Sequence, residues 1–378
     1  MMSFVIIISV VMTLLYATLM LLYRKGWQTQ PVFSAPNHVP QTKISIIIPA
    51  RNEADNIGKC IEAILAQEYP KELYEIIVID DHSEDDTAAI VKQYKHPNVR
   101  CIQMADHPAD TTIAYKKKAL SLGIALAKGE LIITTDADCT AANQWLHNMA
   151  AIYEQQQAVM IVAPVDFTCN DSVVQLFQSL DFMSMQGITA ASHRLGLGNM
   201  SNGANLAFTK AAYNAVDGYK GIDHLASGDD FLLMMKMRYA YPTRISYLKS
   251  TEAIVSTAPQ PDWSSFLQQR IRWASKSGKY DDKRLTAILM LVYLYNVLLL
   301  IIAIAGIFHT HYLLLFVSML LVKTEVEIYY LLPVAKFFGK RRQLRYFPLL
   351  QPLHMLYIVL AGLLGFVGVY KWKGRKLR

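Results

Sequence analysis

Carboxylates recur in pairs along the chain, at positions that suit cation and phosphate chemistry. The pairs are Asp80 with Asp81, Asp136 with Asp138, and Asp229 with Asp230. Carboxylate oxygens are good ligands for Mg²⁺ and Mn²⁺, and both cations also take diphosphate oxygens. A cationic and aromatic run, 269–273, follows the carboxylates and suits a diphosphate or a sugar ring. Such a set suits the binding of a divalent cation together with a nucleoside diphosphate.

Asp136 and Asp138 are the predicted metal ligands. They follow the apolar run 131–135, so both stand just after a predicted strand, where they can share one hard cation. Pairs with this spacing often occur by chance in solvated turns, and the place after a strand is what favours a metal site here. Asp136 is also expected to contact the nucleotide.

The ends of two earlier strands carry candidate nucleotide contacts. Asp80 and Asp81 could hold a base, ribose or metal, or could belong only to the cap of the helix that begins at Thr87. The segment 49–53 is expected to open a helix whose free N–H groups suit a phosphate, a plain capped helix start being the alternative. Lys116 could reach the diphosphate, although lysine clusters are more often solvated. The assigned residues are Pro49, Ala50, Arg51, Glu53, Asp80, Asp81, Lys116 and Asp136.

Asp230 and the run 269–273 are the candidates for the chemical step. Asp230 could act as a general base on an acceptor hydroxyl, or could only favour the dipole of the helix that it opens. Arg272 could stabilise a leaving diphosphate, and Trp273 could stack on a sugar ring. The alternative for both is an anchor at a membrane interface.

Alternating strands and helices must position these residues. Short β-branched runs predict buried strands at 44–49, 75–80, 98–104 and 130–135, and helical spacing predicts helices at 52–67, 87–94 and 116–128. This order predicts right-handed βαβ units on a parallel sheet, which binds ligands at the carboxyl ends of its strands. Later elements are expected at 159–164, 171–191, 204–208, 229–240 and 263–279, the last as a helix at the membrane surface.

Apolar segments at both ends predict a membrane protein. The stretch 1–23 has no charged side chain, can cross a hydrocarbon core of about 30 Å, and is followed at once by Arg24 and Lys25. A cleaved signal peptide is the alternative, but such signals carry their positive charge before the apolar stretch. The positive-inside rule places the N-terminus outside and the following domain in the cytoplasm.

Three further apolar segments, at about 285–308, 312–337 and 347–370, are expected to enter the membrane. Three more crossings would place the basic residues 371–378 outside, against the positive-inside rule. Either one segment is re-entrant or interfacial, or the rule is overridden. Lys323 and Glu327 stand four residues apart and can pair, to line an acceptor path or as a structural pair.

Composition narrows the function classes. The net charge of +7 is concentrated near membrane-flanking segments and suits anionic lipid, and no basic stripe typical of nucleic-acid binding is present. The four cysteines lack metal-ligand or disulfide-framework spacing, as expected in a reducing compartment. A transporter does not fit the large βα-patterned middle of the chain.

Taken in order, these motifs resemble those of the membrane-integrated inverting glycosyltransferases of family 2. That family includes synthases of cellulose, hyaluronan and poly-N-acetylglucosamine, and enzymes that glycosylate carotenoids and other lipids. The segment 49–53, Asp81 (or Asp80), and Asp136 with Asp138 match its nucleotide motifs, and Lys116 resembles its GKxxAL lysine, although Tyr115 replaces the glycine.

The remaining motifs lie towards the acceptor side in that family. Asn205 ends a run that resembles the GAN loop, and Asp230 matches the second position of the ED motif, with Asp229 in place of the usual Glu. The motif QxxRW is matched by Gln269, Arg272 and Trp273.

The resemblance implies a GT-A fold, an α/β domain with a Rossmann-like, mostly parallel sheet, flanked by transmembrane helices. The expected parts are an anchor at 1–23, a linker at 24–42, the GT-A domain at 43–260, an interfacial helix at 261–284, membrane helices at 285–370 and a basic tail at 371–378. The implied location is the cytoplasmic (inner) membrane of a bacterium, with several crossings and the catalytic domain in the cytoplasm.

The implied reaction is an inverting single displacement with Mg²⁺ or Mn²⁺ at Asp136 and Asp138 and with Asp230 as the base. Gln269, Arg272 and Trp273 join Asp230 as catalytic residues, and the acceptor contacts are Asn205, Asp229 and Trp273. The donor is expected to be a nucleotide sugar, most commonly of uridine diphosphate, and the acceptor a lipid or a lipid-linked glycan. The alternatives are a processive synthase of a β-linked polysaccharide and an inactive subunit that only binds nucleotide sugar.

Overall fold

The computed structural model describes residues 2–107, 114–169, 172–197, 200–225, 228–275, 282–367, 370–372 and 375–377. The chain divides into two compact units that interleave along the sequence. One unit consists of residues 31–167 and 199–258 and holds the sheets with the helices that cover them. The other consists of residues 1–30, 168–198 and 259–378 and is mainly helical.

The first unit is built on a seven-stranded sheet in the order β3-β2-β1-β4-β8-β6-β9. Strands β3, β2, β1 and β4 are parallel, β8 is antiparallel to β4 and β6, and β9 is parallel to β6. The strands are β1 Ile44–Ala50, β2 Tyr74–Asp80, β3 Val99–Gln103, β4 Leu131–Thr134, β6 Met160–Val162, β8 Leu206–Thr209 and β9 Ile245–Tyr247. The parallel half therefore contains the four strands expected from the βα pattern.

Unbroken apolar runs explain why these strands form the centre of the unit. Ile46, Ile47 and Ile48 of β1 are fully buried, as a strand with both faces covered requires. Helix α4 lies against β1 because Gly123 leaves room, since a Cβ there would lie 2.6 Å from Cγ2 of Ile47. The helices of this unit are α2 Ile57–Leu65, α3 Thr87–Gln93, α4 Tyr115–Leu126, α5 Trp145–Gln156, α7 Lys210–Ala215 and α8 Asp229–Ala240.

Short elements complete the first unit beside the seven-stranded sheet. A small sheet has the order β5-β10-β7, from β5 Thr140–Ala141, β10 Val255–Thr257 and β7 Val165–Phe167. The 3₁₀ turns among the described residues of this unit are η1 Lys71–Leu73, η2 Met104–Asp106, η3 Gly203–Asn205 and η4 Thr251–Ala253. Because β5 begins two residues after Asp138, the small sheet continues the chain from the predicted metal ligands.

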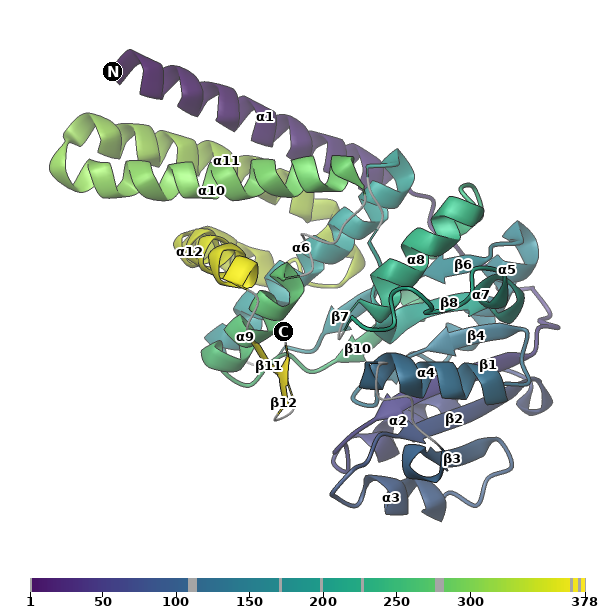
Figure 1. Cartoon of the computed structure of the whole chain (residues 1–378). Helices are drawn as coiled ribbons and strands as arrows, with labels where there is room; N and C mark the ends of the chain where they lie inside the picture. The colour runs from purple at the N-terminus through teal and green to yellow at the C-terminus, as the bar shows by residue number, and fades with distance from the viewer. Residues whose placement is uncertain are drawn as a thin grey trace. The chain divides into compact units, whose positions relative to one another are not determined.

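The second unit consists of long helices and a C-terminal hairpin (Figure 1). Its elements are α1 Met2–Thr29, α6 Val173–Leu195, α9 Trp263–Ala274, α10 Lys283–Phe308, α11 Thr310–Phe337, η6 Gln343–Tyr346, α12 Phe347–Val367, β11 Tyr370–Trp372 and β12 Arg375–Leu377. The structure groups α6 with these helices, whereas the predicted boundaries included it in residues 43–260.

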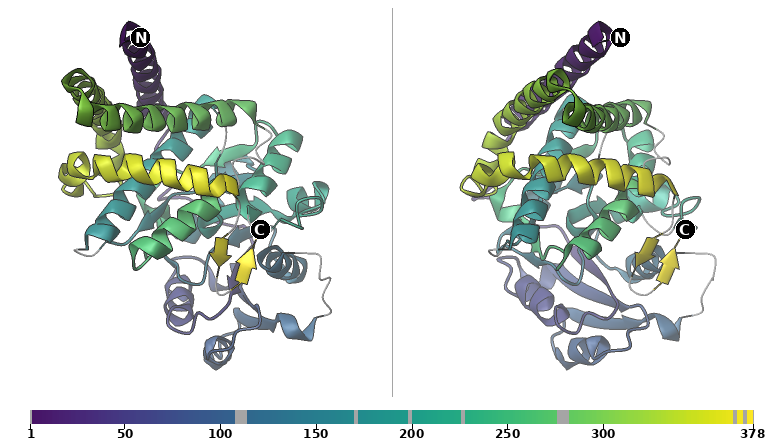
Figure 2. Two further views of the ribbon diagram at one scale, coloured as in Figure 1. Left: turned by 60° about the vertical axis from the view of Figure 1, so that its left-hand side comes forward. Right: turned by 90° about the vertical axis from the view of Figure 1, so that its left-hand side faces the viewer.

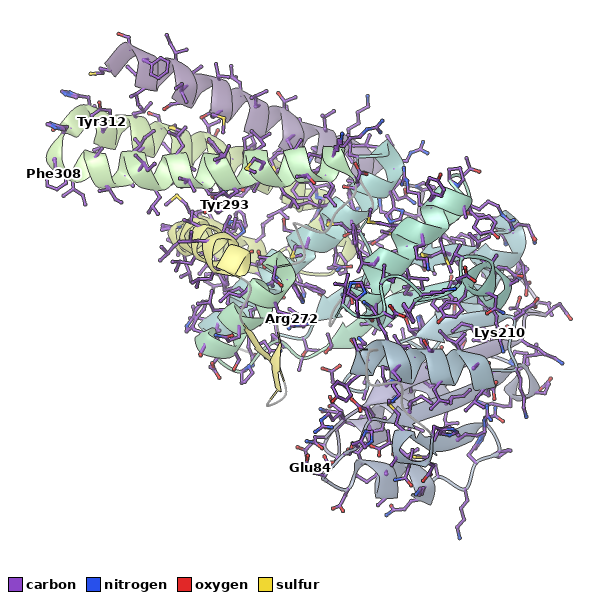
Figure 3. All side chains as sticks on the ribbon, viewed as in Figure 1. Glu84, Lys210, Arg272, Tyr293, Phe308 and Tyr312 are labelled. Carbon is purple, nitrogen blue, oxygen red and sulfur yellow. The ribbon has the colours of Figure 1, made fainter. Side chains whose placement is uncertain are left out.

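Helices α1, α10 and α11 run alongside one another in this unit. Tyr16 bonds Glu327 and Trp27 packs on Phe337, so α1 and α11 are parallel. The hairpin of α10 and α11 turns at His309, with Phe308 and Tyr312 at its tip (Figure 3). Figure 1 looks almost along α12, whereas the other three helices extend across that view, and Figure 2 shows α12 at full length. Helix α12 therefore crosses their direction.

Three stretches are long and apolar enough to cross a membrane by length and composition. They are Met2–Thr29, Lys283–Phe308 and Gln343–Gly365, within the described residues. The stretch Thr310–Phe337 is not among them, and it carries Lys323, Glu325 and Glu327.

Candidate active site

The predicted lysine, a predicted metal ligand and the Asp-Asp pair meet beside the carboxyl end of β4. Lys116 Nζ lies 2.8 Å from Oδ1 of Asp136 and 3.4 Å from Oδ2 of Asp229. Asp230 is the next residue of α8, and its Oδ2 accepts a hydrogen bond of 3.1 Å from the backbone N–H of Gly203. The three sequence motifs that carry these residues, widely separated along the chain, thus form one polar cluster.

Gly203 lies close against that cluster. A Cβ at this position would lie 3.2 Å from Oδ2 of Asp229 and 3.7 Å from Nζ of Lys116. The loop is held from the other side by Thr134, the last residue of β4, whose hydroxyl donates 2.9 Å to the carbonyl of Gly203. Strand β4 therefore positions both the Asp136 segment and the loop that meets Asp230.

Lys116 is a permanent cation within the cluster. Burial acts to lower the pKa of Lys116, but the charges of Asp136, Asp229 and Asp230 outweigh burial and raise it above its usual range. The side chain as a whole retains 27% of its exposure. A charged donor at this position suits a diphosphate oxygen.

Asp138 is surrounded by negative charge. Burial, Asp136 and Glu53 raise the pKa of Asp138 above its usual range. A cation that binds Asp136 and Asp138 would relieve this repulsion. No group of three or more His, Cys, Asp and Glu side chains in the described part of the chain is arranged to hold a metal. Two carboxylates still fit Mg²⁺ or Mn²⁺, because such ions are commonly held by one or two carboxylates together with substrate phosphates.

The carboxylates at the end of β2 are buried, and the neighbouring loop holds them in place. Arg51 Nη1 donates to the carbonyls of Asp81 and His82, at 2.9 and 3.1 Å. Oδ1 of Asp80 is buried and has no hydrogen-bond partner within the described residues. A buried acceptor of this kind is a natural partner for a ribose hydroxyl or a base N–H.

The expectation that 52–67 is a continuous helix with free N–H groups at its start is wrong. Helix α2 begins at Ile57, and Asn52 has a φ of 51°, which breaks the helical path. The N–H groups of Asn52, Glu53 and Ala54 are already bonded to the loop after β2. Their acceptors are Ser83 Oγ at 3.0 Å, Thr87 Oγ1 at 2.8 Å and Asp85 Oδ2 at 3.0 Å. The segment 49–53 thus braces the Asp80–Asp81 loop.

Asn205 is in a different environment from the one predicted for an acceptor contact. Its side chain has 0% exposure, and its amide donates to the carbonyls of Pro164 and Ala253, at 2.7 and 2.8 Å. Its Oδ1 accepts from Nε1 of Trp145 at 2.9 Å. With no exposed surface, the amide fixes the loop that carries Gly203. Trp145 is not among the residues predicted from the sequence, because its contact with Asn205 joins residues 60 positions apart.

Gln269, Arg272 and Trp273 belong to α9 of the helical unit, and Figure 3 labels Arg272 on that helix. Helix α9 begins after Asp262, whose side chain accepts 2.9 Å from the N–H of Ser265. Oε1 of Gln269 is buried without a hydrogen-bond partner among the described residues. The roles of these three residues in the reaction stay predictions.

Comparisons with known proteins show the family of this chain. A family model described as glycosyl transferase family 2 matches residues 45–207, and one described as glycosyl transferase family group 2 matches residues 131–367. The second match spans more than half of the chain. Together they include all three carboxylate pairs, the Gly203 loop and α9.

Several curated proteins are similar over part of their length. Glycosyltransferase AglE of Haloferax volcanii is 28% identical over 187 residues, which are 50% of this chain and 58% of that protein. Beta-monoglucosyldiacylglycerol synthase of Trichormus variabilis is 29% identical over 136 residues, 33% of this chain and 28% of that protein. Poly(ribitol-phosphate) beta-glucosyltransferase of Bacillus spizizenii is 40% identical over 98 residues, 25% of this chain and 15% of that protein. The matches thus span less than two thirds of each relative.

One solved structure shares the fold over nearly the whole chain. It is the mannosyltransferase PcManGT from Pyrobaculum calidifontis in complex with GDP-Man and Mn²⁺, with a TM-score of 0.58 and 17% identity. The match covers 95% of this chain and 99% of that one. The predicted GT-A fold is thereby confirmed.

Proposed function

Because the chain belongs to the glycosyl transferase family group 2, we propose that it is an inverting glycosyltransferase acting on a lipid or lipid-linked acceptor at the cytoplasmic face of a membrane. The donor is a nucleotide sugar, with uridine diphosphate as the favoured nucleotide. The observation that supports this proposal best is the cluster of Lys116, Asp136 and the Asp229–Asp230 pair around Gly203.

The donor is proposed to bind along the carboxyl ends of β1, β2 and β4. The buried Oδ1 of Asp80 would accept from the nucleoside, and Lys116 would donate to the diphosphate. Asp136 and Asp138 would hold Mg²⁺ or Mn²⁺, which supplies positive charge to the diphosphate oxygens when bound. Arg272 is proposed to stabilise the same leaving group, and Gln269 and Trp273 to act with it.

Asp230 is proposed as the general base. Its two oxygens accept from the N–H groups of Gly203 and Phe231, at 3.1 and 2.7 Å, so the carboxylate is oriented before substrate binds. Each oxygen keeps a second lone pair, which can take the proton of the acceptor hydroxyl. That hydroxyl oxygen bonds to the anomeric carbon while the bond from this carbon to the diphosphate breaks. The nucleoside diphosphate leaves and the configuration inverts.

Membrane insertion through α1, α10 and α11 is part of the proposal. Buried Lys323 and Glu327 pair at 2.8 Å, and both also bond Gln351 of α12, so the charges of α11 face protein and not lipid. Three crossings from an outside N-terminus bring the C-terminus into the cytoplasm.

The distribution of charge along the three helices supports this topology. One end of the bundle carries Arg24, Lys25, Lys283, Arg284 and Lys336, and the α10–α11 turn at the other end, 308–312, contains no Lys or Arg. The positive-inside rule assigns the basic end to the cytoplasm. Helix α12, which crosses the other helices, would lie within the cytoplasmic leaflet and add no crossing.

Product mass spectrometry tests the function. The purified chain in lipid nanodiscs is incubated with Mn²⁺ and a panel of uridine and guanosine diphosphate sugars, with lipids extracted from a bacterial membrane. The expected result is a lipid product one sugar heavier, formed with one donor.

A polymer of high molecular weight would instead favour a processive synthase. Transfer of single sugars to a preformed polymer is a further outcome, and it has specific support from the similarity to a poly(ribitol-phosphate) beta-glucosyltransferase. Absence of any product with every donor would contradict the proposed function.

A further inference from the structure

A buried aspartate outside the proposed site lies at the junction of three helices. Asp181 of α6 has a side chain that is 4% exposed, and its Oδ2 lies 2.7 Å from Nη2 of Arg270 on α9. Tyr357 and His354 of α12 approach the other oxygen, with the Tyr357 hydroxyl donating at 2.7 Å and His354 Nε2 at 3.3 Å. One carboxylate therefore ties α9 and α12 to α6.

The charge of this carboxylate is held by its neighbours. Burial acts to raise the pKa of Asp181, but Arg270, His354 and Tyr357 outweigh burial and lower it below its usual range. Asp181 is therefore ionised at neutral pH, and its partners are charged or polar groups fixed on rigid helices.

Arg270 carries the contact into the middle of the QxxRW motif. The residue stands directly after Gln269 and three before Trp273, so it shares a helix face with Trp273. Its guanidinium carbon lies 4.4 Å from the centre of the Trp273 ring and 4.9 Å from that of Phe266. Trp273 also packs on Phe182, the residue after Asp181 in the chain, and the centres of the two rings lie 6.0 Å apart. The orientation of the indole thus depends on the place of Arg270.

Packing around the carboxylate is apolar and tight. Phe177, one turn before Asp181 on α6, contacts the rings of Phe266, Tyr357 and His354. Beyond it, a Cβ at Gly365 of α12 would lie 2.7 Å from Cβ of Ala274, so α12 and α9 approach closely. A buried ion pair adds little net stability, because the cost of desolvation offsets the attraction between the charges. Apolar side chains of similar volume could therefore replace this pair without a large loss in the free energy of unfolding. What the pair supplies is a fixed point of contact, since the ionised carboxylate holds the Arg270 guanidinium at 2.7 Å.

We propose that Asp181 is a positioning residue for sugar transfer, which holds Arg270 and thereby sets the rotation of α9 and the orientation of Gln269, Arg272 and Trp273. This inference rests on the proposed function for its kinetic consequence, but the restraint on α9 is independent of it. Loss of the pair should leave donor binding intact and slow the chemical step, because α9 would be folded but misaligned.

The test compares two double variants of the full chain in nanodiscs. Asp181→Leu with Arg270→Met replaces the pair by apolar groups, and Glu75→Leu with Arg100→Met does the same to the ion pair of 2.8 Å between β2 and β3 in the other unit. We expect the first double variant to lose at least about tenfold in kcat with less than about twofold change in the donor KM. Amide exchange in 263–274 should be faster in this variant, and the second double variant should change neither quantity.

Each other outcome has a definite meaning. Unchanged kcat or unchanged exchange in α9 of a folded first variant overturns the inference, and so does an equal loss in the second variant. If the first variant does not fold, Asp181→Asn is measured by the same two readouts and decides in the same way. If the wild-type protein transfers no sugar, the proposed function fails, and amide exchange alone decides whether Asp181 restrains α9.

Discussion

Lys116 and Asp136 form an ion pair of 2.8 Å, so the residue proposed for the diphosphate neutralises a residue proposed for the metal. Donor and cation would have to bind together, with the diphosphate of the donor contacting Lys116 and the cation contacting Asp136. The free protein is thus arranged so that neither charge is left uncompensated before substrate binds.

Replacing the lysine should separate these two binding events. Lys116→Met removes the competitor for Asp136, so Mn²⁺ alone should bind more tightly, while the donor should bind about ten- to a hundredfold more weakly. Titration calorimetry with Mn²⁺ and then with donor measures both. The matched control is Lys118→Met, which should alter neither, and weaker Mn²⁺ binding in Lys116→Met would contradict the proposed competition.

Asp230→Asn should abolish turnover while donor binding survives. The amide keeps the shape and can still accept from Gly203, but it cannot take a proton, and loss of a general base typically costs about 10²- to 10⁴-fold in rate. Steady-state kinetics and donor calorimetry check this. Asp217→Asn, a change in the loop after α7, is the control, and a rate within about threefold of wild type in Asp230→Asn would exclude the proposed role.

Asn205→Ala should destabilise the sheet unit. The change leaves the indole N–H of Trp145 and the carbonyls of Pro164 and Ala253 without their present partner in a buried place. An expected loss of about 2 to 4 kcal/mol follows from several unsatisfied groups. Urea unfolding followed by Trp fluorescence measures it against the exposed change Asn214→Ala, and equal midpoints for both variants would contradict the structural role.

Lys249 should make the free energy of unfolding change with pH in the alkaline range. Burial lowers the pKa of Lys249 to about 8, whereas the unfolded chain has the ordinary value near 10.4. Between these values the unfolded state binds more protons, so the free energy of unfolding rises with pH across that window.

Lys249→Met should therefore stabilise the protein at pH 7, by on the order of 2 kcal/mol, and remove the rise. Thermal midpoints between pH 7 and 10.5 report both effects, with the exposed change Lys128→Met as control. A rise that persists in Lys249→Met would assign it to another group.

Cysteine labelling decides the proposed topology. In a chain without its four native cysteines, His311→Cys at the α10–α11 turn should react with an impermeant maleimide added to intact cells. Arg345→Cys in η6 should react only after the membrane is opened. Reaction of both positions from outside would refute three crossings.

The boundaries of helices could be predicted from the sequence where neighbouring residues alone determine them. Helix α8 spans Asp229–Ala240, as predicted, because acidic residues after a glycine mark its start. The start of α2 was mispredicted because Asn52 adopts a positive φ and its neighbours bond to residues 83–87. Such a contact between loops has no periodicity in the sequence.

The site shows the same division between local and distant information. The strand ends identified Asp80 and Asp136, since apolar runs and their last residues can be read locally. The burial of Asn205 under Trp145 could not be inferred, because it depends on α5 packing against a loop 60 residues later. The grouping of α6 with the C-terminal helices depends likewise on distant contacts, among them Asp181 with Arg270.

The polar contact of Glu327 has a consequence for biogenesis. Its partners are Tyr16, near the beginning of the chain, Lys323 on its own helix, and Gln351, near the end. Tyr16 of α1 therefore acquires this partner only after some 300 further residues have been made. The bundle can close only late in synthesis, and a chain truncated before α12 would expose an incompletely paired carboxylate to the quality-control proteases of the membrane.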